Sequence, residues 1–348
     1  MSANSELPID LRSDTVTRPT AAMRRAMAEA EVGDDVLDGD PTTRRLEAVV
    51  AERLGKESAL YFPTGTMANQ VAIWMLSRPG TEILVDGDAH IVTSEMAGAA
   101  AFSGVQIRVV RAAGAVMNAI DVAAALPTAG DAPEQTLMCI ENTHNSAGGA
   151  VTTLDGMRAL QSVAQRGKLA VHLDGARLWN ASAATGTSLA DFAACADTVM
   201  VSFSKGLGAP VGAALAGPAD VITRAVRARR RFGGGMRQSG MLAAAALHGI
   251  EHHLARLPED HTSARYLANA IDGIGGVRVI KPDTNIVMID LPIPCATEVV
   301  ARARQHGVLI SHWHASRVRA VTHLDAPAEL VAEAAKRLTH ALEQSLKS

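Results

Sequence analysis

The 348-residue chain is poor in cysteine, and the cysteines that it has are not spaced for cross-links or metal ligation. Cys139, Cys195 and Cys295 lie far apart and are odd in number. This usage argues against a disulfide framework and against a zinc site, and it fits a reduced, cytoplasmic location best.

Long apolar runs and an excess of one charge are also missing. No run approaches the ~20 apolar residues of a membrane-spanning helix, and the N-terminal M-S-A-N-S-E-L-P-I-D lacks a basic region followed by an apolar stretch. A formal net charge of −3 gives no reason to expect nucleic acid or an anionic membrane as a partner. The one local exception is a basic cluster at Arg227, Arg229, Arg230 and Arg231, which by itself is typical of a solvated helix face.

The first two thirds of the chain alternate short apolar runs with stretches of helical period. This alternation is typical of strands joined by crossover helices. The candidate strands cover residues 59–62, 82–85, 107–110, 136–140, 169–173, 198–201 and 212–216, and the candidate helices cover 41–54, 66–76 and 154–165. Several strands are apolar on both faces, as in a mainly parallel sheet covered by helices. We therefore predict a large α/β domain over residues 1–249 with a mainly parallel, seven-stranded sheet.

The pattern changes after Gly249. A helix is expected near residues 261–271, then strands at 277–280 and 285–289, a helix at 297–305, strands at 308–311 and 318–321, and a closing helix from Ala328. Residues 250–348 are thus expected to form a small α+β domain of ordinary size.

An acid and a lysine follow two strands that are consecutive along the chain. Asp174 ends A-V-H-L-D, where open α/β sheets bind ligands, and Lys205 lies in S-F-S-K-G-L-G-A-P, whose small residues let a large ring approach the backbone. Pyridoxal phosphate chemistry needs a lysine for the Schiff base and an acid that keeps the pyridine nitrogen protonated. Arg177 could donate to the ring's phenolic oxygen. The alternatives are a helix cap for Asp174 and surface roles for the two cations.

Other polar residues lie at similar strand ends. Y-F-P-T-G-T-M-A-N-Q places Thr64, Gly65 and Thr66 at a predicted helix start, where backbone N–H groups and hydroxyls could cradle a phosphate, although T-G-T alone often only caps a helix. His90 in V-D-G-D-A-H could stack on the cofactor and act as a base, and His144 in I-E-N-T-H-N is a second candidate base. Satisfied buried histidines are the alternative reading of both.

The pair of imidazoles in H-W-H, His312 and His314, would lie on one face of a strand. No acidic or cysteine ligand accompanies them, so no metal is expected there.

The motifs follow one another in a fixed order along nearly the whole chain. They are I-D-L-R-S-D-T-V-T-R-P-T at 9–20, V-G-D-D-V at 32–36, D-P-T at 40–42, T-G-T-M-A-N-Q at 64–70, I-E-N-T-H-N at 140–145, H-L-D-G-A-R at 172–177, S-K-G-L-G-A-P-V-G at 204–212, G-G-G-M-R-Q-S-G at 233–240 and R-A-V-T-H at 319–323. This ordered set resembles the threonine aldolases of the β-eliminating lyase family, which are pyridoxal 5′-phosphate enzymes of the aspartate-aminotransferase-like fold, fold type I.

The resemblance implies a role for each matching residue. It implies Lys205 as the Schiff-base lysine, Asp174 as the pyridinium partner, and residues 64–66 as the phosphate cradle. It implies His90 as the stacking residue, and Arg177 as a contact of the ring oxygen and of the substrate.

Four further residues gain roles from the same resemblance. Ser13 and Arg319 would hold the substrate's α-carboxylate, a task that suits the paired donors of a guanidinium. Arg230 and Arg237 would reach a phosphate, that of a neighbouring subunit, since family members are typically homotetramers with active sites at subunit interfaces.

The implied reaction is reversible cleavage of the Cα–Cβ bond of L-β-hydroxy-α-amino acids, of the threonine and allo-threonine type, to glycine and an aldehyde. Anchoring the carboxylate would set that bond perpendicular to the ring, and His90 or His144, directly or through water, would take the β-hydroxyl proton. The alternatives are a phenylserine-type aldolase or a β-eliminating lyase with a bulkier substrate, or an aminotransferase. A dehydrogenase or a scaffold lacks support because no G-x-G-x-x-G follows an early strand.

The chain departs from the family at two places. Leu37 stands where tyrosine is common, and Thr93 and Ser94 stand where aromatic residues are common after the stacking histidine. Smaller side chains at these positions indicate a β-substituent larger than methyl.

Overall fold

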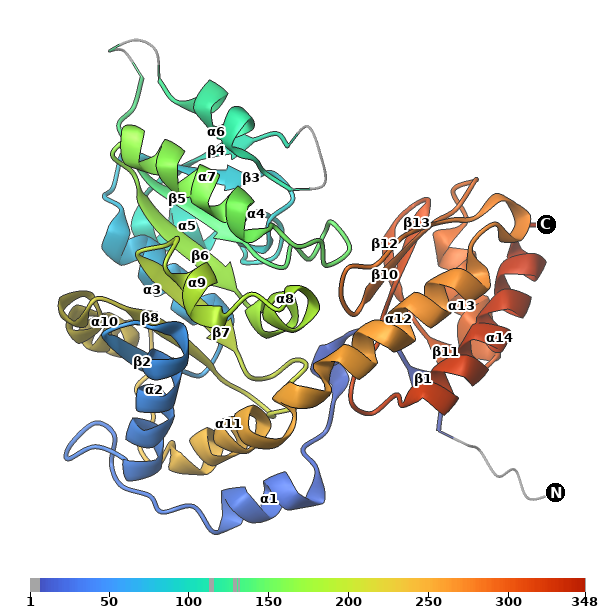
Figure 1. Ribbon diagram of the computed structural model, residues 1–348, viewed down its shortest axis with the longest axis horizontal. Helices are drawn as coiled ribbons and strands as arrows, with labels where there is room; N and C mark the ends of the chain where they lie inside the picture. The colour runs from blue at the N-terminus through green and yellow to red at the C-terminus, as the bar shows by residue number, and fades with distance from the viewer. Residues whose placement is uncertain (1–6, 113–115, 128–129, 131, 348) are drawn as a thin grey trace. The chain divides into compact units, whose positions relative to one another are not determined.

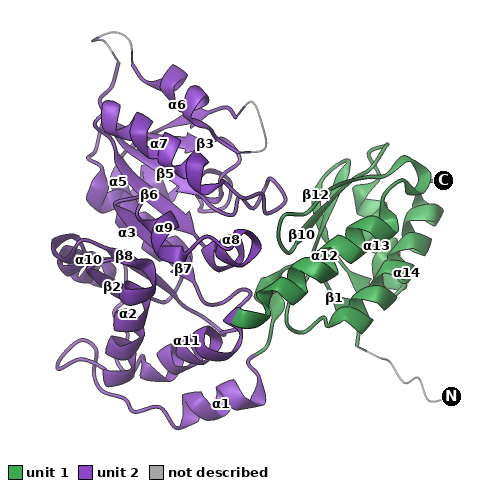
Figure 2. Cartoon of the chain, in the orientation of Figure 1, with its two compact units in different colours: residues 1–18, 255–348 green, residues 19–254 purple. Residues whose placement is uncertain are grey.

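A computed structural model describes residues 7–112, 116–127, 130 and 132–347. The chain forms two compact units, which are Pro19–Leu254 and the pair of segments Met1–Arg18 and Ala255–Ser348 (Figure 2). The N-terminal arm groups with the C-terminal segment because β1 (Ile9–Asp10) pairs in parallel with β11 (Val308–Leu309). The division into domains at residue 249 stays a prediction, since a compact unit is not by itself an independently folding domain.

Residues 19–254, which form unit 2 in Figure 2, are built on a seven-stranded sheet in the order β2-β8-β7-β6-β5-β3-β4 (Figure 1). The strands are β2 (Ser58–Phe62), β3 (Glu82–Asp86), β4 (Gln106–Val110), β5 (Gln135–Glu141), β6 (Ala170–Gly175), β7 (Thr198–Ser202) and β8 (Ala213–Gly217). Strand β8 runs antiparallel to both of its neighbours, and the other neighbouring strands pair in parallel. The predicted mainly parallel sheet of seven strands is confirmed.

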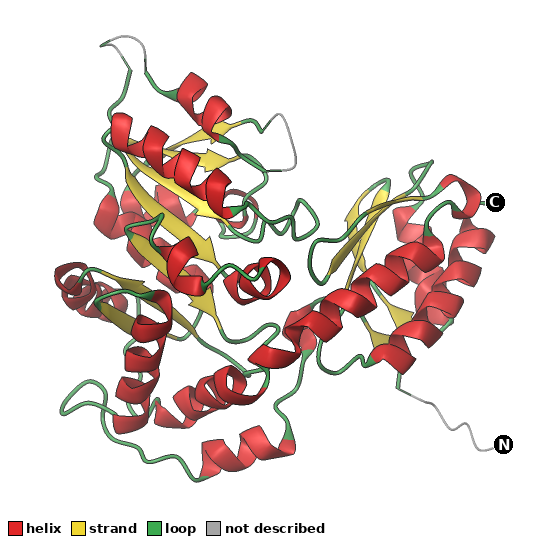
Figure 3. Ribbon diagram, viewed as in Figure 1, coloured by secondary structure: helices red, strands yellow, loops and turns green. Residues whose placement is uncertain are grey.

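Helices lie on both sides of this sheet (Figure 3). One layer packs α3 (Gly65–Leu76) and α10 (Ala219–Arg231) against Leu60 and Phe62 of β2, which share a face because side chains alternate along a strand. The predicted helices at 41–54 and 154–165 appear as α2 (Pro41–Leu54) and α7 (Leu154–Arg166). The remaining helices of this unit are α1 (Ala21–Ala28), α4 (His90–Thr93), α5 (Gly98–Ser103), α6 (Ala119–Ala125), α8 (Leu178–Thr185), α9 (Leu189–Ala193) and α11 (Gly240–His252).

The other unit, labelled unit 1 in Figure 2, is an α+β fold, as predicted. Its antiparallel sheet has the order β12-β13-β10-β9, formed by β9 (Arg278–Ile280), β10 (Ile286–Asp290), β12 (Ser311–His314) and β13 (Arg317–Val321). Its helices are α12 (Leu257–Ile271), α13 (Ala296–Gln305) and α14 (Ala328–Ser345), and their apolar faces share one core with the inner face of the sheet. Three short 3-10 helices, η1 (Asp14–Val16), η2 (Leu254–Arg256) and η3 (Ile274–Gly276), complete the elements of the described chain.

Across the described residues, no helix combines the length and the apolarity that crossing a bilayer requires. The three cysteines are unpaired, with Cys139 and Cys195 buried and Cys295 partly exposed.

Candidate active site

Polar side chains gather where the parallel strands of the seven-stranded sheet end. Asp174 is the second-last residue of β6, His90 begins α4 just after β3, and Lys205 follows β7. Because the carboxyl ends of parallel strands meet at one edge of a sheet, these three residues converge, as the sequence predicts for a ligand site.

Asp174 is a buried carboxylate with a fixed orientation, only 2% exposed. Its Oδ1 accepts a hydrogen bond from the backbone N–H of Ala176 at 3.0 Å, and its Oδ2 accepts one from Nδ2 of Asn69 at 2.8 Å. Since both oxygens are held, the carboxylate is oriented before any ligand binds.

His90 is the half-exposed member of the group. Its Nδ1 lies 2.9 Å from Oε1 of the buried Glu95, and its backbone N–H donates to Oε2 of Glu141 at 2.7 Å. The hydrogen bond with Glu95 raises the pKa of His90 against the opposing effect of burial; Asp174 raises it further and Lys205 lowers it. His90 therefore lies within electrostatic reach of both residues that the sequence places at the centre of the site.

The side chains of His90, Glu95 and Asp174 come close together. One ring nitrogen of His90 and one carboxylate oxygen each of Glu95 and Asp174 lie within 4.8 Å of one another. The hydrogen bonds described above already occupy Oε1 of Glu95 and both oxygens of Asp174.

The predicted phosphate cradle lies at the start of a helix. The hydroxyl of Thr64 caps α3 by accepting the backbone N–H of Met67 at 3.1 Å. Thr64 and Thr66 are exposed, and a Cβ added to Gly65 would lie 3.2 Å from Cε of Met200. The α3 N-terminus therefore offers backbone N–H groups and two accessible hydroxyls, which is a donor set suited to an anion.

The turn that carries Lys205 is fastened at both ends. The carbonyl of Lys205 accepts the N–H of Gly208 at 2.8 Å, and Phe203 donates its N–H to the carbonyl of Gly212 at 3.0 Å. Gly212 has φ +112°, and a Cβ there would collide with the ring of Tyr61. The glycines of S-K-G-L-G-A-P-V-G thus let this turn fold tightly at the end of β7.

Arg177 is buried at the start of α8, where its Nη1 donates to Oδ1 of Asn145 at 3.2 Å.

The loop that carries Asn145 also holds His144, which is buried. Its Nδ1 accepts the N–H of Ala147 at 3.3 Å, and its Nε2 lies 3.3 Å from Oδ1 of Asp86. Burial lowers the pKa of His144, but its carboxylate neighbours, Asp86 first, outweigh that effect and raise it. Both ring nitrogens of His144 thus face protein groups.

The two arginines expected at a phosphate bind a loop of their own chain. Nη2 of Arg230 donates to the carbonyl of Val36 at 2.7 Å, and Nη1 of Arg237 lies 3.1 Å from Oδ2 of Asp34. The side chain of Arg237 is 56% exposed, so its guanidinium is accessible to an incoming anion. A role toward a neighbouring subunit stays a prediction.

Ser13 and Arg319 both belong to unit 1 of Figure 2. The hydroxyl of Ser13 caps η1 by accepting the N–H of Thr15 at 3.2 Å. Nη2 of Arg319 donates to the carbonyl of Arg12 at 3.1 Å, and its Cζ lies 4.8 Å from the ring centroid of Trp313. The fold therefore brings Arg319 beside the segment that carries Ser13, although 305 residues lie between the two in the chain.

His312 and His314 alternate with Ser311 and Trp313 along β12, and both imidazoles belong to exposed residues. A register shift between them interrupts the pairing of β12 with β13.

Five polar residues at the site were not predicted from the sequence. They are Asn69, Glu95, Glu141 and His172, which are buried, and Asn145, which is partly buried. Four of them stand inside the motifs described above, such as T-G-T-M-A-N-Q and I-E-N-T-H-N. A polar residue at an apolar position of a helix or strand was the available signal.

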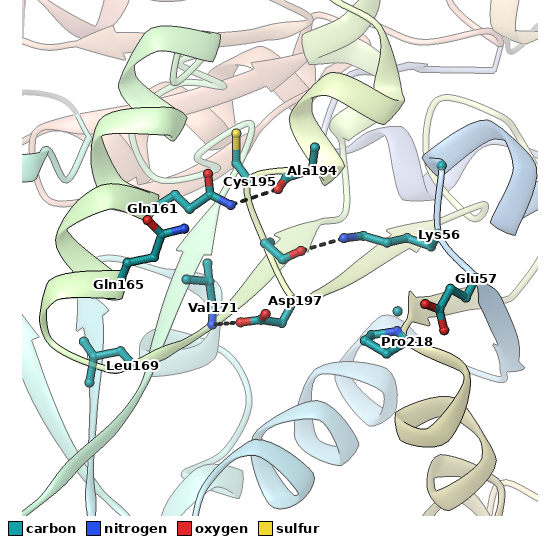
Figure 4. Close-up of a pocket in the computed structure, with 13 residues that line it drawn as sticks. Lys56, Glu57, Gln161, Gln165, Leu169, Val171, Ala194, Cys195, Asp197 and Pro218 are labelled. Atoms are coloured by element: carbon teal, nitrogen blue, oxygen red, sulfur yellow. Dashed lines mark hydrogen bonds between the residues drawn. The ribbon is translucent and has the colours of Figure 1, made fainter.

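A cavity of about 400 Å³ lies at the opposite end of the strands (Figure 4). Its lining includes Val171, the second residue of β6, and Asp197, which precedes β7. Within it, Nζ of Lys56 donates to the carbonyl of Ala196 at 2.6 Å, and Asp197 accepts the N–H of Val171 at 2.7 Å. These groups satisfy one another, and the cavity is separate from the predicted site.

Comparison with known proteins gives a consistent relationship. The family model for beta-eliminating lyases matches residues 10–293. The chain is 39% identical over 325 residues to low-specificity L-threonine aldolase 1 of Arabidopsis thaliana, covering 90% of this chain and 91% of that protein. It is 40% identical over 329 residues to the low specificity L-threonine aldolase of Escherichia coli strain K12, covering 94% and 97%.

Among solved structures, the threonine aldolase of Leishmania major superposes with a TM-score of 0.82 at 18% identity, over 96% of this chain and 100% of that chain. At that identity the likeness shows the fold, and it confirms the predicted fold class.

Proposed function

This chain belongs to the beta-eliminating lyase family, and from that premise we propose that it is a pyridoxal 5′-phosphate-dependent aldolase. It cleaves the Cα–Cβ bond of L-β-hydroxy-α-amino acids of the threonine and allo-threonine type, reversibly, to glycine and an aldehyde. The observation that carries the proposal is the convergence of Asp174, His90 and Lys205 at the carboxyl edge of the sheet.

The residues present fit this cofactor. The buried carboxylate of Asp174 is an acceptor for a protonated ring nitrogen, and the α3 N-terminus at residues 64–66 suits a phosphate. Lys205 would attach the cofactor through Nζ, and Arg177 would donate to the ring oxygen. When bound, pyridoxal phosphate supplies the electron sink for the pair left behind when the Cα–Cβ bond breaks.

The α-carboxylate of the substrate is assigned to Ser13 and Arg319. A guanidinium offers paired donors to a carboxylate, and the hydrogen bond from Arg319 to Arg12 keeps this donor beside the Ser13 segment. Arg177 adds a further cation to the substrate side. Fixing the carboxylate fixes the rotation about the amino-acid Cα, and this selects which bond is cleaved.

His90 is favoured as the base for the β-hydroxyl proton. Because Nδ1 of His90 is hydrogen-bonded to Glu95, the other ring nitrogen, Nε2, points away from Glu95. The His90 side chain is 34% exposed. His144 is the weaker candidate because its side chain is 3% exposed and its Nε2 faces Asp86. In its neutral form, Nε2 of His90 would accept the hydroxyl proton while Glu95 stabilises the resulting imidazolium.

We assign the enzyme to the cytoplasm and to a homotetramer with active sites at subunit interfaces. The unpaired thiols of Cys139, Cys195 and Cys295 support a reducing compartment. The exposed guanidinium of Arg237 supports a role toward a partner's phosphate, and Arg230 of α10 binds the same loop at Val36. Sedimentation analysis and cell fractionation test the two assignments separately.

The visible spectrum of the purified protein tests the cofactor assignment. The wild type should be yellow, and Lys205→Ala should lack the absorption band and release no glycine. Lys56→Ala is the matched control, because Lys56 is also a partly buried lysine but lies at the other end of the sheet; it should keep the band. A colourless wild type that takes up no pyridoxal phosphate would refute the proposal.

Product analysis separates the alternatives. The aldolase yields glycine and an aldehyde from a β-hydroxy amino acid, whereas a β-eliminating lyase or an aminotransferase yields an α-keto acid. An α-keto acid as the main product would replace the proposed reaction with one of these.

A further inference from the structure

A buried network of hydrogen bonds connects Asp174 with Glu95 and His90, and Asn69 is its centre. Asn69 is 1% exposed on α3. Its Nδ2 donates to Oδ2 of Asp174 at 2.8 Å and to Oε1 of Glu95 at 2.8 Å. The same Oε1 of Glu95 lies 2.9 Å from Nδ1 of His90. One amide group therefore touches the carboxylate assigned to the ring nitrogen and the carboxylate that holds the proposed base.

The orientation of this amide follows from its partners. Ionised carboxylates only accept hydrogen bonds, so the NH₂ group of Asn69 must face Asp174 and Glu95. Its Oδ1 then faces Nε2 of His172 at 3.0 Å and must accept a hydrogen bond from it. His172 therefore carries its proton on Nε2, and its Nδ1 accepts from the hydroxyl of Thr198 at 2.9 Å.

His172 has the properties that this arrangement requires. It is completely buried in β6, and desolvation lowers its pKa to about 4. It is therefore neutral at physiological pH and has a single tautomer, set by Asn69 on one side and Thr198 on the other.

The amide also keeps two like charges in place. Asp174 and Glu95 are both buried, and their nearest oxygens lie within 4.8 Å of one another in the cluster that includes His90. Buried carboxylates this close repel unless donors stand between them. The two hydrogens of one NH₂ group can serve one carboxylate each, which a hydroxyl or an aliphatic side chain cannot do.

We propose that Asn69 is a positioning residue that orients the carboxylate of Asp174 toward the cofactor ring nitrogen, and that His172 fixes the direction in which the Asn69 amide points. This inference rests on the proposed function, because it assigns Asp174 to that nitrogen. Asn69 and His172 act through Asp174 and touch neither substrate nor cofactor.

The first test removes the amide. Loss of a buried hydrogen bond to a charged group corresponds to a change of about 10- to 100-fold in an equilibrium. Asn69→Ala is expected to raise the dissociation constant of pyridoxal phosphate by that factor and to lower kcat more than it raises KM. The affinity is measured by titrating cofactor-free protein and following the visible band, so this readout does not depend on turnover.

Gln70→Ala is the matched control. Gln70 is the next residue of α3 and is equally buried, but it donates to Oε2 of Glu95 at 2.6 Å and makes no hydrogen bond to Asp174. Its cofactor affinity should stay within about threefold of the wild-type value. Two substitutions of His172 give a second test. His172→Leu should lower the affinity for pyridoxal phosphate by part of the Asn69→Ala effect. His172→Gln, which keeps an N–H donor, should retain the wild-type affinity.

A measurement on the wild type tests the inference even if the variants do not fold. Side-chain ¹⁵N NMR of the cofactor-free protein at neutral pH should show His172 as the neutral Nε2–H tautomer. The Nδ1–H tautomer or a charged ring would overturn the inference, because the Asn69 amide would then lack the donor that directs it.

The outcomes separate this inference from the proposed function. A wild type that binds no pyridoxal phosphate overturns both. A wild type that binds the cofactor and releases glycine, together with an Asn69→Ala protein of unchanged affinity and unchanged kcat, overturns only the positioning role.

Discussion

Nδ1 of His90 lies 2.9 Å from Oε1 of Glu95, and this pairing couples the protonation of the proposed base to a carboxylate that is fully buried. The hydrogen bond favours the charged imidazole and so raises the pKa of His90; Asp174 adds to the effect, and Lys205 and burial oppose it. A base works only in its neutral form, so activity should fall as the pH drops through this raised pKa.

Glu95→Gln tests that coupling. Because the carboxylate is replaced by a neutral acceptor, the pKa of His90 should fall, and the acid limb of the kcat/KM profile should move to lower pH. The matched control is Glu82→Gln, in which a buried carboxylate paired with Arg108 is neutralised at the far end of β3. That profile should keep its wild-type acid limb. An acid limb that Glu95→Gln leaves in place would remove His90 as the base.

The same pairing has a consequence for stability. A histidine whose folded pKa is raised contributes stability that is fully present below its unfolded pKa of about 6.5 and is lost as the pH rises through the folded pKa. Glu95→Gln should therefore destabilise the protein more at acidic than at alkaline pH. Denaturant unfolding of wild type and variant at the two pH extremes measures the difference, and a loss that does not change with pH would contradict the assigned protonation.

The turn of Lys205 depends on one glycine. Gly212 has φ +112°, which side-chain-bearing residues rarely adopt, and a Cβ there would collide with Tyr61. Gly212→Ala should cost at least about 2 kcal/mol of stability and should lower activity further, because Phe203 donates its backbone N–H to the Gly212 carbonyl that closes the turn.

Gly186→Ala is the control for the backbone effect alone. Gly186 has φ +72°, and no heavy atom lies within 4 Å of an added Cβ. It should cost about 1 kcal/mol and leave kcat unchanged. Equal losses of stability in the two variants, measured by chemical denaturation, would show that the clash between the added Cβ and Tyr61 does not destabilise Gly212→Ala.

A buried arginine should be more important for stability than its exposed neighbours on α10. Arg229 is 2% exposed; its Nη1 donates to the carbonyl of Tyr61 and its Nη2 to Oδ2 of Asp35, both at 2.6 Å. Arg229→Met would leave Asp35 and that carbonyl without these donors, and it should cost about 3–5 kcal/mol.

Arg224→Met is the comparison on the same helix. Arg224 and Asp220 form an exposed pair at 3.6 Å. Its loss should change the free energy of unfolding by no more than about 0.5 kcal/mol. Similar effects of the two substitutions on urea midpoints would contradict the importance of the buried pair.

Much of the fold follows from local pattern, and several of the exceptions have a physical reason. Apolar runs such as 198–201 and 136–140 predict buried strands because a parallel sheet covered by helices is apolar on both faces. The short helices α4 and α8 were not predicted, since four to eight residues contain too few turns to show a helical period. The pairing of β1 with β11 joins segments from opposite ends of the chain, and no local signal encodes such a contact.

The site divides in the same way. Asp174 and Lys205 could be predicted because each follows an apolar strand directly. The role of Asn69 could not be predicted: a polar residue in the apolar helix α3 is conspicuous, but its partners Asp174 and Glu95 are distant in sequence. A hydrogen-bond network whose members come from several elements becomes visible only when the chain is folded.

Substrate scope is the property in which this enzyme should differ from other members of the family. Leu37 is 73% exposed, and Thr93 and Ser94 are exposed at the end of α4, the helix that His90 begins. We expect these side chains, which are smaller than the aromatic residues common there in the family, to leave room for a large β-substituent. We expect phenylserine to be cleaved at least as efficiently as threonine, measured as kcat/KM for glycine release.

Thr93→Phe should reverse this preference. Added bulk in a pocket changes discrimination by about tenfold or more for each group excluded, so the phenylserine-to-threonine ratio of kcat/KM should fall by at least that factor. Thr93→Val is the matched control, because it keeps the volume and removes only the hydroxyl that donates to the carbonyl of Ala89; its ratio should stay near the wild-type ratio. A wild type that strongly prefers threonine over every bulkier substrate, or a Thr93→Phe protein with an unchanged ratio, would mean that other residues line the path of the β-substituent. In that case Leu37, on the loop that Arg230 and Arg237 fasten, is the next position to change.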